Sequence, residues 1–199
     1  MAISEGFTGP RTTERVALPP GQHLAQGFPV LSAGATPLVA RAAWSMTVTT
    51  TSGRQQQWDF AGLGELPVED IAVDLHCVTG WSKLGTHWRG VPVTAVLDGV
   101  EDPAATAVMA TSYGDYTTNL PIEDLLGGRA WLVFDYEGSP LVPEHGGPVR
   151  LLVPHLYLWK SAKWVHGLTL MTRDRPGFWE SLGYHLYGDP WKEQRYSRD

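Results

Sequence analysis

The chain lacks a second cysteine. Cys77 is the only cysteine among 199 residues, which excludes an internal disulfide, a Cys-x-x-Cys motif and a c-type haem attachment site. A solitary thiol can pack inertly in a core, act as a nucleophile, or serve as a single soft ligand to a metal. The residues around Cys77 have to decide among these three roles.

Long apolar runs and export signals are missing as well. No stretch approaches the ~20 apolar residues that a membrane-spanning helix needs. Residues 1–10 show neither the basic and apolar regions of a secretory signal nor a twin-arginine pair. Since no disulfide framework is possible, we expect a cytoplasmic protein without a membrane span.

An excess of positive charge is also absent. The net charge of -6 argues against a general nucleic-acid-binding surface. Residues 1–149 contain 7 Lys/Arg against 16 Asp/Glu, whereas residues 150–199 contain 8 against 5. A C-terminal part of opposite sign is suited to a compact anionic ligand, although chance variation over a solvated surface gives the same pattern.

Common nucleotide-, metal- and hydrolase-type motifs do not occur. There is no Walker A loop, no dinucleotide-binding Gly-x-Gly-x-x-Gly and no His-Glu-x-x-His. Residues 80–82 begin like the nucleophile elbow of a serine hydrolase, but Leu84 stands where the second glycine is required. A serine hydrolase is therefore disfavoured.

The composition predicts an ordinary folded domain, with 43% hydrophobic and 18% charged residues. Residues 1–36 are rich in Gly, Pro, Ser and Thr, and we expect them to form an arm that packs on a single domain of residues 37–199. Phe28, Val30 and Leu31 are the expected anchor of this arm.

The apolar patterns predict more strands than helices. Alternation or apolar runs indicate strands, and proline or glycine punctuation indicates short helices. This pattern is typical of an α+β fold of mixed β-sheets with short helices. The expected strands are 44–49, 58–60, 71–75, 106–111, 116–120, 131–136, 149–153 and 163–171, and the expected helices are 92–97, 121–126 and 178–182.

Several separate motifs occur in a fixed order along most of the chain. They lie at residues 18–22, 27–31, 75–82, 88–91, 147–154, 157–163, 178–180 and 183–191. In this combination the chain resembles the sulfite oxidase-like molybdopterin-binding family, which includes bacterial methionine-sulfoxide-reducing molybdoproteins. The resemblance implies a sulfite oxidase-type fold and a molybdenum cofactor with a single pyranopterin, in its plain form without a nucleotide.

The resemblance gives Cys77 the third of its possible roles. In this family a cysteine thiolate binds molybdenum, which also carries two dithiolene sulfurs of the pyranopterin and oxygen ligands. A soft thiolate suits such a sulfur-rich redox metal. Cys77 is the only residue of this sequence that can supply it.

The resemblance also implies a set of cofactor-binding residues. A pyranopterin carries a phosphate and amide-rich rings, so its pocket needs cations and hydrogen-bonding groups. Arg150 and Lys163 match the family's cationic contacts, and both lie in the basic C-terminal part. The full set is Thr111 or its neighbour Ser112, His145, Arg150, Ser161, Ala162 and Lys163.

Two positions depart from the family's pattern. His145 stands where the sulfoxide-reducing relatives have an asparagine, which changes the expected surroundings of the pterin. The relatives' Tyr-Thr cofactor contact has no counterpart in residues 1–36, where Gln22 or His23 is the candidate replacement.

The substrate pocket is defined less clearly by the sequence. Asp115 and Tyr116 follow the cofactor-binding threonine, and they can relay protons or orient a substrate, or form a polar turn with a packed tyrosine. The roles of His87 and His155 are undecided in the same way. Sulfite oxidases surround their anion site with several arginines, whereas here only Arg89 and Arg150 are available by motif. Glu180 and His185 are expected to be structural, as are most of the nine tryptophans.

These observations predict a molybdenum-dependent oxidoreductase that performs two-electron oxygen-atom transfer. Its expected partner is a small oxo-acceptor or oxo-donor substrate (an S-oxide, an N-oxide or a sulfite-like molecule), with reduction slightly favoured. Since no haem can be attached, a separate electron-transfer partner is expected. Two alternatives stay open: a catalytically silent pterin- or anion-binding module, and a thiol-dependent hydrolase that uses Cys77 with His76 or His87.

Overall fold

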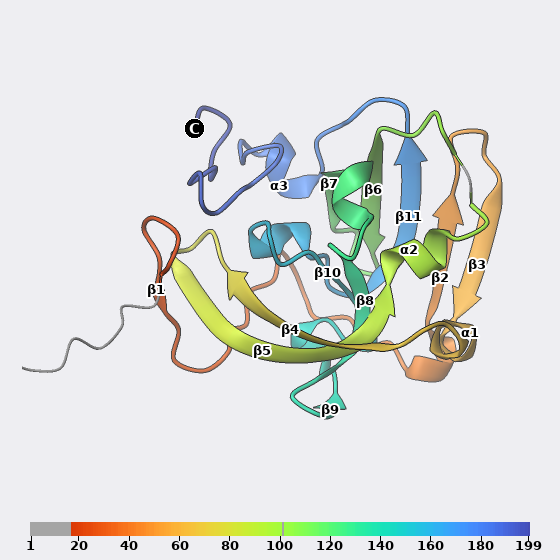
Figure 1. The fold of residues 1–199 in the computed structure, drawn as a ribbon, viewed down its shortest axis with the longest axis horizontal. Helices are drawn as coiled ribbons and strands as arrows, with labels where there is room; N and C mark the ends of the chain where they lie inside the picture. Colours follow the sequence, from red (N-terminus) through yellow and green to blue (C-terminus); the bar gives the residue numbers. More distant parts are fainter. Residues whose placement is uncertain (1–16, 101) are drawn as a thin grey trace, which may run out of the picture.

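The computed structural model describes residues 17–100 and 102–199, whose strands form two β-sheets (Figure 1). The first sheet has the order β1-β5-β8-β10, with β4 paired to β5 and β9 paired to β8. Its strands are β1 (His23–Leu24), β4 (Glu69–His76), β5 (Trp81–Pro92), β8 (Trp131–Tyr136), β9 (Ser139–Pro140) and β10 (Arg150–Leu152).

The second sheet has the order β3-β2-β11-β6-β7. Strand β11 is central, pairing in parallel with β2 and antiparallel with β6. The strands of this sheet are β2 (Ser45–Thr49), β3 (Gln55–Asp59), β6 (Ala107–Ser112), β7 (Thr117–Pro121) and β11 (Val165–Met171).

Helices in the described residues are short and lie between strands. Three are α-helical and four are 3-10 turns, so none has the length to form a layer of its own, and none is long and apolar enough to cross a bilayer. They are α1 (Phe60–Glu65), α2 (Val93–Leu97), α3 (Phe178–Ser181), η1 (Arg41–Ala43), η2 (Ile122–Leu125), η3 (Pro143–His145) and η4 (Leu158–Lys160).

The main core fills the space between the two sheets. Met46 and Val48 of β2 contact it from one side, and Leu132 and Leu151 of β8 and β10 from the other; all four are fully buried. The alternation seen in residues 44–49 therefore marks the face that turns inward, as a half-buried strand requires. A smaller cluster lies on the other face of the first sheet and includes Trp88.

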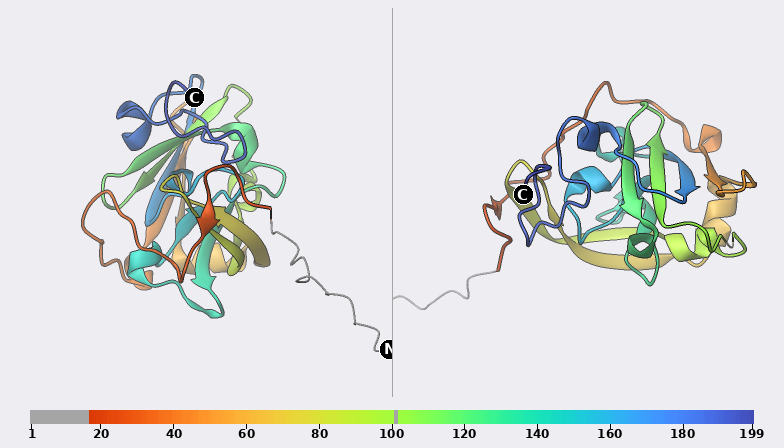
Figure 2. Two further views of the ribbon diagram at one scale, coloured as in Figure 1. Left: turned by 90° about the vertical axis from the view of Figure 1, so that its left-hand side faces the viewer. Right: turned by 90° about the horizontal axis from the view of Figure 1, so that it is seen from above.

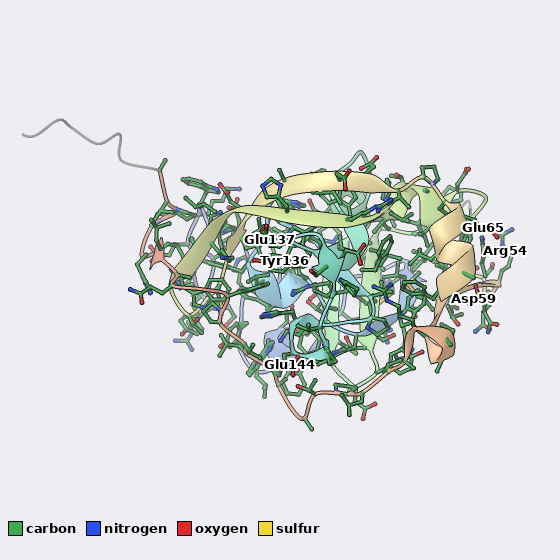
Figure 3. All side chains as sticks on the ribbon, turned by 90° about the horizontal axis from the view of Figure 1, so that it is seen from below. Arg54, Asp59, Glu65, Tyr136, Glu137 and Glu144 are labelled. Atoms are coloured by element: carbon green, nitrogen blue, oxygen red, sulfur yellow. The ribbon has the colours of Figure 1, made fainter. Side chains whose placement is uncertain are left out.

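The predicted α+β class is confirmed, but several short elements and two of the longer ones, β5 and α1, were not expected. Strand β5 is the longest of the described strands. Its alternation of apolar and polar residues is hard to recognise in the sequence because Gly85 and Gly90 interrupt it. Helix α1 contains two glycines, yet Asp59 caps it by accepting a hydrogen bond of 2.7 Å from the Gly62 N–H. Figure 3 shows Asp59 and Glu65 near this helix.

Residues 17–36 of the arm cross the first sheet. Strand β1 pairs in parallel with the start of β5, at Trp81 and Ser82. Phe28 packs into an aromatic group that includes Trp88 and Tyr136. The expected anchor is only partly correct, because Val30 and Leu31 are about half exposed and Phe28 alone fills this role. Residues 1–16 of the predicted arm lie outside the described part of the chain.

The C-terminal segment after β11 returns to the same end of the molecule as β1 and the β4–β5 turn, as both views of Figure 2 show. Arg195 confirms this proximity, because its guanidinium donates hydrogen bonds to the carbonyls of Pro20 and Val78. Three segments that are distant in sequence therefore meet around the turn that carries Cys77.

Candidate cofactor and active site

Cys77 lies in the turn between β4 and β5. The turn is closed by the Cys77 N–H, which donates to the Trp81 carbonyl at 2.8 Å, and by the Gly80 N–H, which donates to the Cys77 carbonyl at 3.0 Å. Gly80 has φ of +97°, a conformation that favours glycine. The turn therefore presents the thiol at the end of a strand pair, in a fixed backbone frame.

Side chains from both ends of the described chain hold this turn. Gln22 Nε2 donates to the Cys77 carbonyl at 3.0 Å. Arg195 donates to the next carbonyl, that of Val78. Ser82 and His76 extend the arrangement, since Ser82 Oγ lies 2.8 Å from His76 Nδ1 and 3.3 Å from Gln22 Oε1. Burial lowers the pKa of His76, and Asp74 only partly opposes this.

The Cys77 thiol faces a cavity of about 320 Å³. The wall is formed by the arm, the β4–β5 turn, residues around η3 and η4, and the C-terminal segment. Seven of its 22 lining residues are Phe, Tyr or Trp, which suits a ligand with flat rings. These aromatic residues are Phe28, Trp81, Tyr116, Trp159, Trp164, Trp179 and Tyr184.

Arg150 brings a buried cation to this cavity. Its side chain donates to the carbonyls of His145 at 3.0 Å and Ser161 at 2.9 Å, and only 2% of the residue is exposed. Burial lowers the pKa of Arg150 to about 10, a value at which it is still charged at neutral pH. Within the described residues no carboxylate pairs with it, so its positive charge is available to an anionic ligand.

Lys163 is the second cation of the cavity. Its ammonium donates to the carbonyls of Leu31 at 2.8 Å and Glu144 at 2.6 Å, and to Ser32 Oγ at 3.2 Å. Burial, reinforced by the neighbouring Arg150 charge, lowers the pKa of Lys163 to about 8. Lys163 therefore ties the arm to the η3 turn, and Figure 3 shows Glu144 beside the arm.

His145 and Trp81 contribute polar atoms that have no partner in the described protein. The His145 ring stacks on Phe28 with centroids 4.0 Å apart, and its Nδ1 is buried without a hydrogen bond. The Trp81 Nε1 is in the same situation. Burial lowers the pKa of His145, and the Arg150 and Lys163 charges add to this effect. Unpaired buried polar atoms are costly, so a ligand with amide groups fits this wall.

The remaining residues assigned to the cofactor differ in their access to the cavity. Ser161 lines it, with its Oγ accepting from the Val153 N–H at 2.9 Å. Ala162 is buried in the main core and does not line the cavity. Thr111 lies beside Gly167 in the second sheet, and Ser112 has a buried Oγ without a partner; neither belongs to the cavity wall.

Of the two residues predicted to act on the substrate, the structure places only Tyr116 at the cavity. Tyr116 lines the cavity, and its hydroxyl donates to the Trp159 carbonyl. Burial raises the pKa of Tyr116 well above its usual value, so the phenol stays protonated. Asp115 is exposed in a turn with φ of +60°, and it is not part of the cavity wall.

The other candidates lie away from the cavity. His87 and Arg89 alternate with buried residues of β5, and both are exposed to solvent. His155 is paired with Asp124 at 2.9 Å. His23 is exposed and does not line the cavity. Arg89 is therefore not in a position to bind a substrate anion there.

Sequence reasoning missed several parts of the site. The arm residues 31–35 line the cavity, although their composition suggested only a loop. Trp81 was part of a quoted motif, but its unpaired Nε1 depends on its surroundings. Arg195 carried no local signal, since it reaches the turn of Cys77 only through the return of the C-terminal segment.

Comparisons with known proteins agree with this geometry. Residues 33–179 match the family described as "Oxidoreductase molybdopterin binding domain". The chain is 39% identical over 185 residues to the uncharacterized oxidoreductase YuiH of Bacillus subtilis, covering 92% of this chain and 93% of that protein. It is 26% identical to the protein-methionine-sulfoxide reductase catalytic subunit MsrP of Burkholderia mallei, covering 73% of this chain but only 49% of MsrP.

The fold is also found among solved structures. The crystal structure of the sulfane dehydrogenase SoxCD from Paracoccus pantotrophus superposes with a TM-score of 0.63 at 18% identity, covering 69% of this chain and 40% of that one. This likeness confirms the predicted architecture of mixed sheets and short helices. Since the present chain spans half or less of MsrP and of this structure, the activities in their names are those of longer proteins.

Proposed function

The chain belongs to the oxidoreductase molybdopterin-binding domain family, and we propose that it is an enzyme that holds molybdenum through the Cys77 thiolate and a single pyranopterin. The reaction is a two-electron oxygen-atom transfer on a small molecule. When bound, the molybdenum cofactor supplies the redox chemistry, and the protein supplies the ligand, the pocket and the access to it.

The observation that carries this proposal is the combination of groups in one cavity. The Cys77 thiol shares it with Arg150 and Lys163, two cations that have no carboxylate partner among the described residues. The buried Nδ1 of His145 and Nε1 of Trp81 offer further hydrogen bonds. A thiolate for a soft metal, cations for a phosphate and polar atoms for amide rings are what this cofactor requires.

Each residue then has a defined task. Cys77 holds the metal, while Arg150 and Lys163 bind the anionic groups of the pterin. His145, stacked on Phe28, lines the same cavity.

The cavity wall favours a neutral S-oxide or N-oxide as substrate. Seven aromatic side chains line the cavity, and its buried arginine, Arg150, is assigned above to the anionic groups of the pterin. A site for sulfite would need additional cations, and Arg89 lies on the outer face of β5. The names of two relatives, the MsrP subunit and a putative protein-methionine-sulfoxide reductase subunit YedZ1 of Azospira oryzae (30% identical, 57% of its length covered), point in the same direction.

Tyr116 is the residue proposed to orient the substrate, because it lines the cavity as a protonated phenol. A role for Asp115 stays a prediction that requires its turn to close over the cavity. Both named relatives are subunits, which supports a separate electron-transfer partner. The cytoplasmic location also stays a prediction, which cell fractionation tests.

Elemental analysis provides the direct test. Wild-type protein, Cys77→Ser and Cys77→Ala are purified from one molybdate-fed host, with Thr47→Val as a control on the far side of the molecule. We expect near one molybdenum per wild-type or control chain and a sharp loss in both Cys77 variants. A folded wild type without molybdenum, from a host with intact cofactor synthesis, would refute the enzyme proposal and favour a silent binding module.

A further inference from the structure

The hydroxyl of Thr79 lies next to the sulfur of Cys77. The distance between Thr79 Oγ1 and Cys77 Sγ is 3.2 Å, and both residues line the cavity. In the part of the chain that the structure describes, this hydroxyl has no other hydrogen-bond partner. We infer that Thr79 donates a hydrogen bond to the metal-bound thiolate and thereby raises the reduction potential of the metal; this inference rests on the proposed function.

The direction of the hydrogen bond follows from the chemistry of the ligand. In a free thiol, either the sulfur or the hydroxyl can be the donor. A thiolate bound to a metal has lost its proton, so the sulfur can only accept. The Thr79 hydroxyl is then the donor, and Thr79 is a positioning residue that acts on the metal through Cys77.

The backbone keeps the hydroxyl beside the sulfur. Thr79 sits in the four-residue turn closed by the Gly80 N–H and the Cys77 carbonyl. Gln22 and Arg195 hold the carbonyls of Cys77 and Val78 from outside the turn. Since two successive peptide groups of the turn are fixed in this way, the Thr79 side chain needs only one rotamer to keep its contact with Sγ.

The effect on the metal follows from charge. Adding an electron to the metal increases the negative charge on its thiolate ligand, so a hydrogen bond to that sulfur is stronger in the reduced state. Hydrogen bonds to ligand sulfur are known to tune the potentials of copper–thiolate and iron–sulfur sites in this way. Loss of the Thr79 hydroxyl therefore shifts the potential to lower values and the thiolate-to-metal charge-transfer absorption to longer wavelength.

The test compares molybdenum-loaded wild-type protein with Thr79→Val, Thr79→Ala and Thr79→Ser. Val has nearly the same shape as Thr without the hydroxyl, and Ser restores the hydroxyl. Thr47→Val, on β2, controls for the same substitution elsewhere. Redox titration followed by electron paramagnetic resonance gives the potential, visible absorption gives the charge-transfer band, and metal analysis gives the molybdenum content.

At the wild-type midpoint potential, we expect the reduced-to-oxidised ratio to fall about threefold to tenfold in Thr79→Val and Thr79→Ala. Thr79→Ser and Thr47→Val stay near wild type. Should Thr79→Val fail to load the metal, the comparison of Thr79→Ala with Thr79→Ser decides.

Two kinds of failure are distinguishable. Full molybdenum content with unchanged potential and absorption in Thr79→Val and Thr79→Ala overturns the role of Thr79 but leaves the proposed function intact. Absence of molybdenum from wild type, or its retention in Cys77→Ser, overturns both.

Discussion

The buried ion pair between Lys160 and Glu180 leads to a quantitative prediction about the support of the cavity wall. Both side chains are fully buried, with Lys160 Nζ 2.6 Å from Glu180 Oε1. The same carboxylate oxygen accepts hydrogen bonds of 2.9 Å from Thr118 Oγ1 and from the Nε1 of Trp159. Since Trp159 lines the cavity, this pair connects a charge network to the wall of the site.

Replacing Glu180 with alanine leaves Lys160 without its counterion. Burial already lowers the pKa of Lys160, and Glu180 is the main group that opposes this. Carbonyls of Asn119 and Leu186 still accept from the ammonium, but carbonyls do not neutralise a buried charge. Removal of one partner from a buried ion pair costs about 3–5 kcal/mol. For a chain of this size, that corresponds to a melting temperature lower by roughly 6–20 °C.

The measurement is thermal and urea-induced unfolding of wild type, Glu180→Ala, Lys160→Met and the double variant Lys160→Met/Glu180→Ala, which closes a double-mutant cycle. Glu65→Ala, at an exposed position of α1, is the matched control and should change stability by less than about 0.5 kcal/mol. The double variant should lose less stability than the sum of the two single losses, because no unpaired charge stays buried.

A Glu180→Ala protein whose stability is within about 1 kcal/mol of wild type would contradict this prediction. Strict additivity of the two losses in the double variant would contradict it as well. Either result would mean that water or rearrangement compensates Lys160 at low cost, and that the pair does not hold the wall.

Three further predictions concern the arm, the sheet and the cavity. Lys163→Met should become less stable relative to wild type as the pH rises from 8 to 10.5. The reason is that Lys163 releases its proton near pH 8 in the folded protein but keeps it up to about 10.5 in the unfolded chain. Urea unfolding across this pH range measures the effect, and a constant difference in the free energy of unfolding between the two proteins contradicts it. Phe28→Ala should cost about 1–3 kcal/mol, less than the loss of a fully buried phenylalanine because Phe28 is only partly buried. It should also expose residues 29–36 to limited proteolysis, whereas Val30→Ala, at a half-exposed position, should not. Equal cleavage rates in the two variants would show that stacking on Phe28 does not hold the arm. Gly90→Ala should destabilise the protein by about 1–3 kcal/mol, because a Cβ there collides with the neighbouring strand β8. Gly64→Ala, where a Cβ would meet no atom within 4 Å, should be neutral or stabilise the protein by about 0.5–1 kcal/mol. Equal melting temperatures of the two variants would show that the collision at Gly90 is not the cause.

Strands with unbroken patterns were predictable from local sequence. Residues 131–136 form β8 with the expected bounds, and the alternation of residues 44–49 appears as β2 with its apolar face in the core. Strand β5 was missed because its pairing contains irregularities near Val73 and Gly90, and each shift in register breaks the period of two. Helix α1 was missed because its two glycines hid the capping signal of Asp59.

The family of the chain was recognisable from its sequence, because an ordered set of motifs is a property of the chain itself. The same holds for the choice of Cys77 as the proposed metal ligand, since it is the only cysteine. Which groups share the cavity with Cys77 could be learned only from the fold. Arg150 and Lys163 face it, whereas Arg89 and Asp115 do not. The reason is physical: strand alternation and turn geometry set the direction of each side chain, and burial sets the charge that it carries there.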